Sequence, residues 1–262
     1  MNTESFSWNK IIKKLNIFSG DKVLVSSNTL DIILKLKKIN QNFEPNDLIN
    51  SLKKQIGNNG TLLFPTFNWD FCKGKVFDYH KTKSNSGYLG EVSRKREDFL
   101  RSKNPIYSFT VSGKDTELIC NLDHTSCFGQ DSPFAYLINN NGKNLYIGLK
   151  KIDDAFTFDH VAEETVLVEY RFFKDFNGVV INRAGEKKNK KYRMYVRDLK
   201  SNLRTAVNEK IVDDLIKIKG YEKNVILGIN FIIIDIKKAY NIMVEDLKSE
   251  RKIIYRKKIN NI

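Results

Sequence analysis

Residues 20–38 read GDKVLVSSNTLDIILKLKK, and this stretch carries the clearest fold signal in the chain. Its Gly20-Asp21 pair is typical of a turn, and the apolar run at residues 23–25 predicts a buried strand. From Thr29 onward the apolar residues recur at helical spacing, which predicts a helix over residues 29–39. A strand followed directly by a helix is the building block of α/β folds.

The same alternation of helices and strands continues on both sides of this unit. We expect helices over residues 8–15, 45–57, 88–99 and 115–121, a helix opening near residue 157, and strands over residues 61–64, 106–111 and 144–148. Residues 68–87 are rich in Gly, Ser, Asn and charges, which indicates a long surface loop. The pattern predicts an α/β fold with a mixed central sheet flanked by helices.

The C-terminal third of the chain has a different pattern. Residues 166–173, 178–181 and 191–196 alternate like antiparallel strands, with Gly185 at a turn. Helices are expected over residues 207–218 and 237–247, around a strand pair broken at residues 228–230. We therefore expect a single domain spanning residues 1–262, in which residues 1–165 form the α/β core and residues 166–262 a smaller antiparallel α+β portion.

Cysteine usage and hydropathy bear on the compartment. The three cysteines, Cys72, Cys120 and Cys127, form no CxxC pair, which favours reduced thiols over a disulfide framework. Residues 1–14 lack the apolar core of a signal peptide, and the apolar stretch at residues 225–236 is too short to span a bilayer. These features predict a cytoplasmic protein without membrane insertion.

The formal net charge of +14 is large for 262 residues. A charge of this sign suits nucleic acid, an anionic membrane surface or a phosphate-rich small ligand. Lysines are spread along the whole chain, which favours a solvated basic surface over one concentrated binding face. A nucleic-acid-binding protein, using the basic runs at residues 187–191 and 256–258, is the non-enzyme alternative.

His160 is the strongest candidate for a catalytic group. Residues three apart share a helix face, so Glu163 can fix the orientation and tautomer of the His160 imidazole. A neutral histidine held by a carboxylate is a competent general base near pH 7. The same pattern also fits an ordinary helix with Thr157 as its N-cap. His80 and His124 lie in polar surroundings, and the histidine and cysteine spacing predicts no metal site.

Short motifs recur in a fixed order between Gly20 and Glu163. They are Gly20-Asp21 with residues 23–27; Gly60-Thr61-Leu62, Pro65-Thr66, Trp69 and Asp70; Gly87, Leu89, Glu91 and Arg94; Arg101-Ser102, Pro105, Ser108-Phe109 and Gly113; Phe128-Gly129 and Ser132-Pro133; and residues 149–163 with Thr157, His160 and Glu163. Together they resemble the aminoglycoside 3-N-acetyltransferase (antibiotic N-acetyltransferase) family. The last third is similar more loosely, at Tyr170-Arg171 and residues 195–198.

This resemblance implies direct transfer of an acetyl group from acetyl-CoA to an amine, without a covalent acyl-enzyme. His160, supported by Glu163, would take the proton of the attacking amine. Thr157 or a backbone amide at the start of that helix would stabilise the oxyanion. Acetyl-CoA is then the acyl donor, and no metal is implied.

The resemblance also implies which residues bind the two substrates. The coenzyme would lie along the turn after the first strand, with further contacts from the helix that carries Arg94. A cationic amino sugar would meet carboxylates and aromatic faces on the acceptor side. The expected coenzyme contacts are Ser26, Ser27, Asn28, Ser86, Gly87 and Arg94, and the expected acceptor contacts are Trp69, Asp70, Tyr88 and Asp131. For each Ser and Gly ordinary turn chemistry is an equal alternative, as are a solvated loop for the aspartates and core packing for the aromatics.

Two departures from the family pattern bear on the acceptor. The Arg101-Ser102 motif of the drug-modifying members usually carries histidines where this chain has Asn104 and Tyr107. A strongly basic chain also repels a polycationic drug. Both departures favour a nucleotide-linked amino-deoxysugar, as used in lipopolysaccharide and O-antigen assembly. An aminoglycoside acceptor is the alternative, a member that binds CoA without catalysis is a third hypothesis, and a homodimer is one possible assembly.

Overall fold

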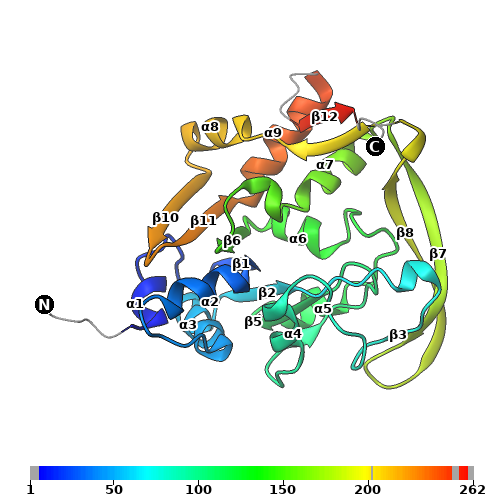
Figure 1. Ribbon diagram of the computed structural model, residues 1–262. Helices are drawn as coiled ribbons and strands as arrows, with labels where there is room; N and C mark the ends of the chain where they lie inside the picture. Colours follow the sequence, from blue (N-terminus) through cyan, green and yellow to red (C-terminus); the bar gives the residue numbers. More distant parts are fainter. Residues whose placement is uncertain (1–5, 202, 250–253, 259–262) are drawn as a thin grey trace, which may run out of the picture.

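The computed structural model describes residues 6–201, 203–249 and 254–258, and a seven-stranded sheet forms its centre (Figure 1). The strand order is β10-β11-β6-β1-β2-β5-β4. Strands β6, β1 and β2 run parallel, and the flanking strands pair antiparallel to their neighbours. The strands are β1 (Lys22–Ser27), β2 (Thr61–Pro65), β4 (Leu100–Arg101), β5 (Phe109–Gly113), β6 (Lys143–Ile147), β10 (Tyr221–Ile226) and β11 (Ile229–Asp235). The mixed central sheet expected from the sequence is confirmed.

Helices cover both faces of this sheet, because successive strand side chains point to opposite sides. In β1, Val23 and Val25 pack into one apolar cluster and Leu24 into the other. The first face packs against α1 (Trp8–Ile12), α2 (Thr29–Lys37), α3 (Pro45–Ile56) and α4 (Tyr88–Arg94). The second packs against α5 (Thr116–Asn121), α6 (Pro133–Asn139), α7 (Phe158–Val166), α8 (Lys210–Lys217) and α9 (Ile236–Ser249). The core therefore has two parts, one on each side of the sheet.

Two smaller sheets complete the described chain. The strands β7 (Arg171–Ile181) and β8 (Lys187–Arg197) form a long antiparallel hairpin at one side of the molecule (Figure 1). The short strand β3 (Phe77–Asp78) pairs parallel to β7. The strands β9 (Leu203–Val207) and β12 (Ile254–Lys258) pair antiparallel. Short 3-10 turns lie at η1 (Phe71–Lys73), η2 (Ile152–Asp154) and η3 (Leu199–Ser201).

Several elements differ from their expected extents. The hairpin strand β7 is continuous where two strands were expected, and the turn at Gly185 lies where the sequence placed it. The helix expected over residues 88–99 ends at Arg94, and the strand expected over 106–111 begins at Phe109. The C-terminal third is antiparallel as expected, but its β10–β11 hairpin joins the central sheet, because β11 pairs with β6.

The parallel strands set the position of the functional site. The carboxyl ends of β1, β2 and β6 meet at one edge of the sheet, where open α/β folds bind ligands. After β1 the side chain of Asn28 caps α2, accepting the Asp31 N–H at 3.2 Å. After β6 the chain turns at Gly148, where a Cβ would lie 2.8 Å from the Asn28 carbonyl oxygen, so only glycine fits. None of the described helices is long and apolar enough to cross a bilayer.

Candidate active site

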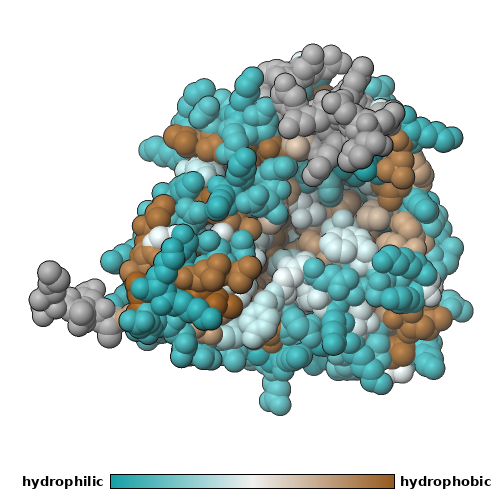
Figure 2. Space-filling view, viewed as in Figure 1, coloured by the Kyte–Doolittle hydropathy of each residue, from teal (hydrophilic) through white to brown (hydrophobic). Residues whose placement is uncertain are grey.

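A cavity of about 360 Å³ opens at the carboxyl edge of the parallel strands. It is lined by Leu24, Ser26, Ser27, Pro65, Phe67, Trp69, Ser86, Tyr107, Leu149, Asp154, Ala155, Thr157 and His160. The face drawn in Figure 2 is hollowed at its middle, between the part that carries α7 and the part that carries α4. Residues from three strand ends and from α7 thus face one space, large enough for a small organic ligand.

Helix α7 places His160 beside Glu163, as the sequence predicted. The distance from His160 Nδ1 to Glu163 Oε2 is 2.9 Å. The Glu163 side chain is fully buried, whereas His160 is partly exposed and lines the cavity. Thr157 holds the N-cap position of α7, yet its hydroxyl makes no capping hydrogen bond within the described chain and lines the same cavity. Capping chemistry alone therefore does not explain Thr157.

The hairpin supplies a cation behind this pair. The distance from Arg171 Nε to Glu163 Oε2 is 2.7 Å, and Arg171 Nη1 donates to the Tyr195 carbonyl at 3.1 Å. The Tyr170 hydroxyl donates to Glu163 Oε1 at 3.1 Å. The buried Glu163 carboxylate is thereby held from both oxygens, so that it can hold the imidazole in turn.

These contacts assign the tautomer of His160. A carboxylate only accepts, so the short contact to Glu163 requires a proton on Nδ1. Arg171 Nη2 lies 3.1 Å from the same Nδ1, but in this tautomer it cannot donate there and acts through Glu163 instead. Nε2 is then the unprotonated ring nitrogen and can accept a proton from a ligand in the cavity.

The surrounding charges shift the pKa of His160. Burial disfavours the imidazolium, but the carboxylates of Asp159 and Glu163 outweigh it, so the pKa of His160 is raised above its ordinary value. Asp159 Oδ1 lies 3.4 Å from His160 Nδ1 and accepts the His160 backbone N–H at 2.8 Å. Burial raises the pKa of Asp159 to about 6. A histidine with a raised pKa is a stronger base than a free one.

Asp159, His160 and Glu163 bring their ligand atoms within 4.8 Å of one another. This donor set suits a proton relay better than a metal ion. Arg171 already places a guanidinium on the Glu163 carboxylate, and a second cation at the same oxygen would be repelled. The ring nitrogen on this side, Nδ1, is the one that needs its proton for Glu163.

The residues expected at the coenzyme divide into two groups. Ser26, Ser27 and Ser86 line the cavity, and the Ser86 hydroxyl also accepts the Phe67 N–H at 2.9 Å. Asn28 caps α2, and Gly87 opens α4 with a φ of 120°. The hydrogen-bond partners of Arg94 do not support its expected contact with the coenzyme.

Arg94 is occupied by other groups. Its guanidinium makes two hydrogen bonds to Glu91, at 2.9 and 2.6 Å, and another to the His80 carbonyl. A bidentate pair of this kind leaves little of the guanidinium for a phosphate. Arg94 therefore stabilises the start of α4 and the loop before it.

The residues expected at the acceptor are also divided. Trp69 lines the cavity and packs edge-on against Tyr107 at 6.1 Å between ring centroids. Asp70 pairs with Lys75 at 3.0 Å and Lys73 at 3.6 Å, and the hydrogen bond from Lys75 lowers the pKa of Asp70. Tyr88 and Asp131 are exposed to solvent. Trp69 is thus the expected acceptor contact that the structure brings to His160.

The structure adds residues that the sequence did not single out for this site. Asp159 precedes His160 directly and was visible in the motif, but nothing in the sequence indicated that it would be buried. Arg171 and Tyr170 lie seven or eight residues after Glu163, beyond the reach of helical spacing. Tyr107 is buried at the cavity wall, and its ring centroid lies 4.8 Å from that of Phe128, which packs on His160.

Comparison with known proteins identifies the family. The sequence model described as aminoglycoside 3-N-acetyltransferase matches residues 35–248. No curated protein matches the chain significantly in sequence.

Solved structures share the fold at low sequence identity. Aminoglycoside acetyltransferase AAC(3)-Xa superposes with a TM-score of 0.75 at 19% identity, over 94% of this chain and 92% of that chain. AAC-IIIb in binary complex with CoASH gives 0.72 at 18%, over 93% and 95%, and AAC-VIa bound to sisomicin gives 0.72 at 19%, over 94% and 98%. The match to the family model covers most of the sequence and includes the His160–Glu163 pair. The chain therefore belongs to the aminoglycoside 3-N-acetyltransferase family and is an N-acyltransferase.

Proposed function

We propose that this protein transfers an acetyl or related short acyl group from its CoA thioester to the amino group of a sugar, with His160 as the general base. The observation that carries the proposal is the position of His160. Its Nδ1 faces Glu163 at 2.9 Å, while the residue lines a cavity of about 360 Å³. An oriented base at the edge of a ligand-sized space is the arrangement that direct acyl transfer to an amine requires.

The chemistry needs one proton acceptor and one oxyanion donor. A sugar amine is protonated in neutral water and must first lose one proton to solvent, which frees its lone pair. Nε2 of His160 would then take a second proton as the neutral nitrogen attacks the thioester carbonyl. The new C–N bond forms, the C–S bond breaks, and the thiolate leaves with a proton returned from the imidazolium. Thr157 lies on the same wall as His160 and is the candidate donor to the oxyanion.

The cavity fits the acyl end of a CoA thioester. Apolar side chains from Leu24, Pro65 and Leu149 suit the slender pantetheine arm. The hydroxyls of Ser26 and Ser27 can bond its amides. The CoASH complex of AAC-IIIb, a protein of the same fold, supports this donor.

A nucleotide-linked amino-deoxysugar is the acceptor that we favour. The net charge of +14 attracts an anionic sugar nucleotide and repels a polycation. The ion pairs of Asp70 with Lys73 and Lys75 also weaken one of the carboxylates that a cationic drug would use.

An aminoglycoside is the second candidate, and specific observations favour it. The chain belongs to a family described by that activity, and AAC-VIa, which shares the fold, is seen bound to sisomicin. Trp69 at the cavity would serve an aminoglycoside ring as well as an amino-deoxysugar.

Thiol release from acetyl-CoA tests the function and separates the two acceptors. We expect release with a panel of nucleotide-linked 3-amino- and 4-amino-deoxysugars that exceeds release with gentamicin-type drugs. Release with the drugs alone would assign the second acceptor, and release with neither panel would refute the proposal.

A variant pair tests the role of His160 in the same assay. His160→Ala should lower kcat/KM by about 10²- to 10⁴-fold, the usual contribution of a general base. The matched control is His80→Ala, because His80 is exposed, its Nε2 lies 3.0 Å from the Arg183 carbonyl oxygen, and it does not line the cavity of His160. Equal activity of His160→Ala and the parent protein would exclude His160 as the general base.

A further inference from the structure

A second cavity, of about 380 Å³, lies where the far end of the β7–β8 hairpin faces β4 and α5. Its apolar wall comes from five elements, with Phe77 on β3, Leu100 on β4, Cys120 on α5, Val180 on β7 and Tyr192 on β8. It shares no lining residue with the cavity of His160 in the described chain. It is therefore a space separate from the cavity of His160.

The charged residues of this cavity are mostly cationic. The cations that line it are Arg101, Lys103, Arg183, Lys188 and Lys190, and the anions are Glu117 and Asp123. Clustered cations around low-dielectric walls focus a positive potential into the space between them. The cavity is thus suited to an anion.

Arg101 gives the cavity a permanent buried charge. It is 3% exposed, and its guanidinium donates to the Ser108 hydroxyl and to the Thr66 and Thr82 carbonyls, all neutral acceptors. It also stacks over the Phe77 ring, 4.6 Å from the centroid. Burial lowers the pKa of Arg101 to about 10, so the group stays charged near neutral pH. Its hydrogen-bond acceptors are neutral and do not offset its charge, and Glu91 is a carboxylate close enough to act on it.

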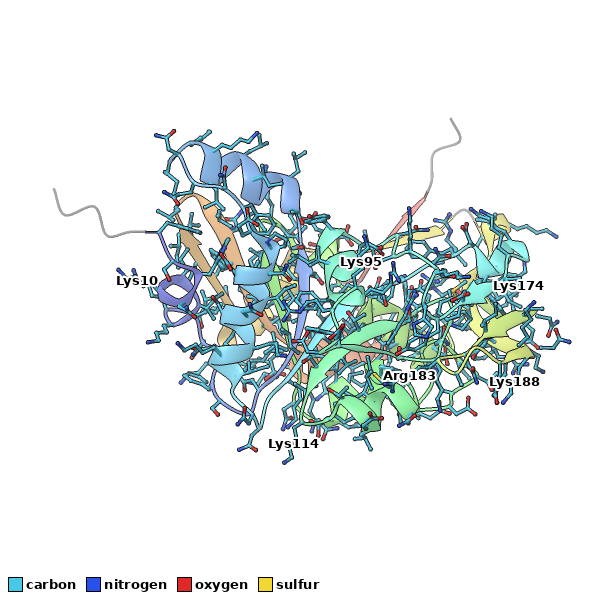
Figure 3. The ribbon with its side chains drawn as sticks, turned by 90° about the horizontal axis from the view of Figure 1, so that it is seen from below. Lys10, Lys95, Lys114, Lys174, Arg183 and Lys188 are labelled. Atoms are coloured by element: carbon cyan, nitrogen blue, oxygen red, sulfur yellow. The ribbon has the colours of Figure 1, made fainter. Side chains whose placement is uncertain are left out.

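The rim adds cations that can move toward a ligand. Arg183 is exposed, near the hairpin turn, and Lys188 pairs with Glu186 at 2.8 Å with more than half of each side chain exposed. Figure 3 looks at the molecule from below and labels Arg183 and Lys188. An exposed lysine pair of this kind is weak and can be exchanged for a stronger anion such as a phosphate.

The walls distinguish the class of anion. Tyr79 is the half-buried aromatic side chain of the lining, whereas Phe77 and Tyr192 are only 2% and 4% exposed and form the wall with Leu100 and Val180. Inorganic phosphate would leave these surfaces unused, whereas a nucleobase packs favourably on an aromatic ring and on aliphatic side chains. A cavity of a few hundred Å³ is the usual size for such a ligand.

We propose that this second cavity is a binding site for a nucleoside diphosphate, with the base against the aromatic wall and the phosphates at Arg183 and Lys188. The site is independent of acyl transfer at His160. Its ligand is recognised by charge and by an aromatic ring together.

Calorimetric titration of the full chain with uridine diphosphate and with adenosine diphosphate tests the site. Arg183→Glu/Lys188→Glu should weaken binding by about tenfold or more, because two attractive charges become repulsive. Lys10→Glu/Lys114→Glu changes the net charge equally at positions outside the cavity and should leave the affinity unchanged. An unchanged Tm in both variants shows that they fold. Equal weakening by the two variants would show a general charge effect and overturn the site.

Two further arms separate this site from its alternatives. Saturating CoA should not displace the nucleotide, and displacement would assign binding to the His160 cavity. Uridine alone and inorganic pyrophosphate alone should each bind more weakly than the intact nucleotide. Pyrophosphate binding as tightly as the nucleotide would show a simple anion cluster and refute the nucleotide class.

Discussion

The buried carboxylate of Glu163 orients the candidate base His160 and helps to raise its pKa. The Glu163 side chain is fully buried, and it contacts the imidazole of His160 and the guanidinium of Arg171 at 2.9 and 2.7 Å. Because the Glu163 carboxylate helps to raise the pKa of His160, it also sets the pH at which the base becomes available.

We expect the pH profile to show this control. A general base acts in its neutral form, so activity should fall as the pH drops through the raised pKa of His160. In Glu163→Gln the pKa of His160 should fall, which moves this acidic limb to lower pH, while kcat at the plateau decreases. The measurement is kcat and kcat/KM against pH for thiol release.

A neighbouring glutamate provides the control for this experiment. Glu164 accepts a hydrogen bond from the Ser126 hydroxyl at 2.7 Å, whereas the charged groups that shift the pKa of His160 are Asp159, Glu163 and Arg171. Glu164→Gln should keep the acidic limb of the parent protein. An identical limb in Glu163→Gln would contradict the role of Glu163.

Arg171 is the counter-ion whose loss should cost stability. Arg171→Met leaves the buried Glu163 carboxylate without its cation, and breaking a buried pair in this way costs about 3–5 kcal/mol. Urea denaturation measures the free energy of unfolding. Arg193→Met removes a solvent-exposed pair with Asp175 and should cost much less. Comparable losses would show that Arg171 does not neutralise Glu163.

At this scale the sequence predicts what lies within one helical turn. The approach of Glu163 to His160 follows from spacing, whereas Ser26, Ser27 and Thr157 were expected from the family resemblance. Arg171 could not be derived, because its approach to Glu163 depends on the direction in which the chain leaves α7. That direction is set at Leu167, which adopts φ 57° and ψ 53°.

Helix α4 illustrates packing at the scale of an element. Gly90 lies so close to β2 that a Cβ would be 2.2 Å from the Pro65 carbonyl oxygen. Gly90→Ala must separate α4 from β2, which should lower the free energy of unfolding by about 1–3 kcal/mol. Because Pro65 lines the cavity of His160, kcat/KM should also fall.

Gly185→Ala is the control for the helix variant. Gly185 has a φ of 82° but open space around it, so alanine strains the backbone by about 1–2 kcal/mol without a clash. It should reduce stability and leave kcat/KM unchanged. Unaltered activity in Gly90→Ala would show that the fit of α4 does not position Pro65.

Elements with strong local signals agree with the sequence, and those fixed by distant partners do not. The helix α3 begins at Pro45 and ends before Gly57, as the proline and glycine at its two ends predict. The short strand β3 exists because it pairs with β7, about a hundred residues away. No pattern in residues 77–78 predicts that pairing. The sequence of the β10–β11 hairpin likewise does not predict that β11 pairs with β6.

The cationic residues are spread along the whole sequence. Hydrophilic side chains cover most of the face drawn in Figure 2 and are interrupted by apolar groups. The basic run at residues 187–191 lies along β8, with Lys188 paired to Glu186 and Lys190 to Asp123. A dispersed charge of this kind favours weak, general attraction of polyanions.

Nucleic-acid binding should therefore be weak and strongly dependent on salt. Fluorescence anisotropy with labelled single-stranded RNA and double-stranded DNA should show binding at low ionic strength that is lost at roughly 150 mM salt, where charges beyond about 8 Å are screened. Different base sequences should bind equally. Sequence-dependent binding that persists at this salt concentration would support the nucleic-acid alternative.

The hairpin β7–β8 constrains how such a protein can diversify. Arg171 begins β7 and contacts Glu163, whereas the turn at Gly185, fourteen residues further along the chain, is exposed. Insertions and deletions at the turn can thus change the residues that line the second cavity without disturbing the contacts that hold His160. A one-residue slip in the register of the hairpin would instead move Arg171 to the opposite face and abolish the support of His160. Length variation among descendants of this chain should accordingly accumulate at the turn, with the first residues of β7 kept in place.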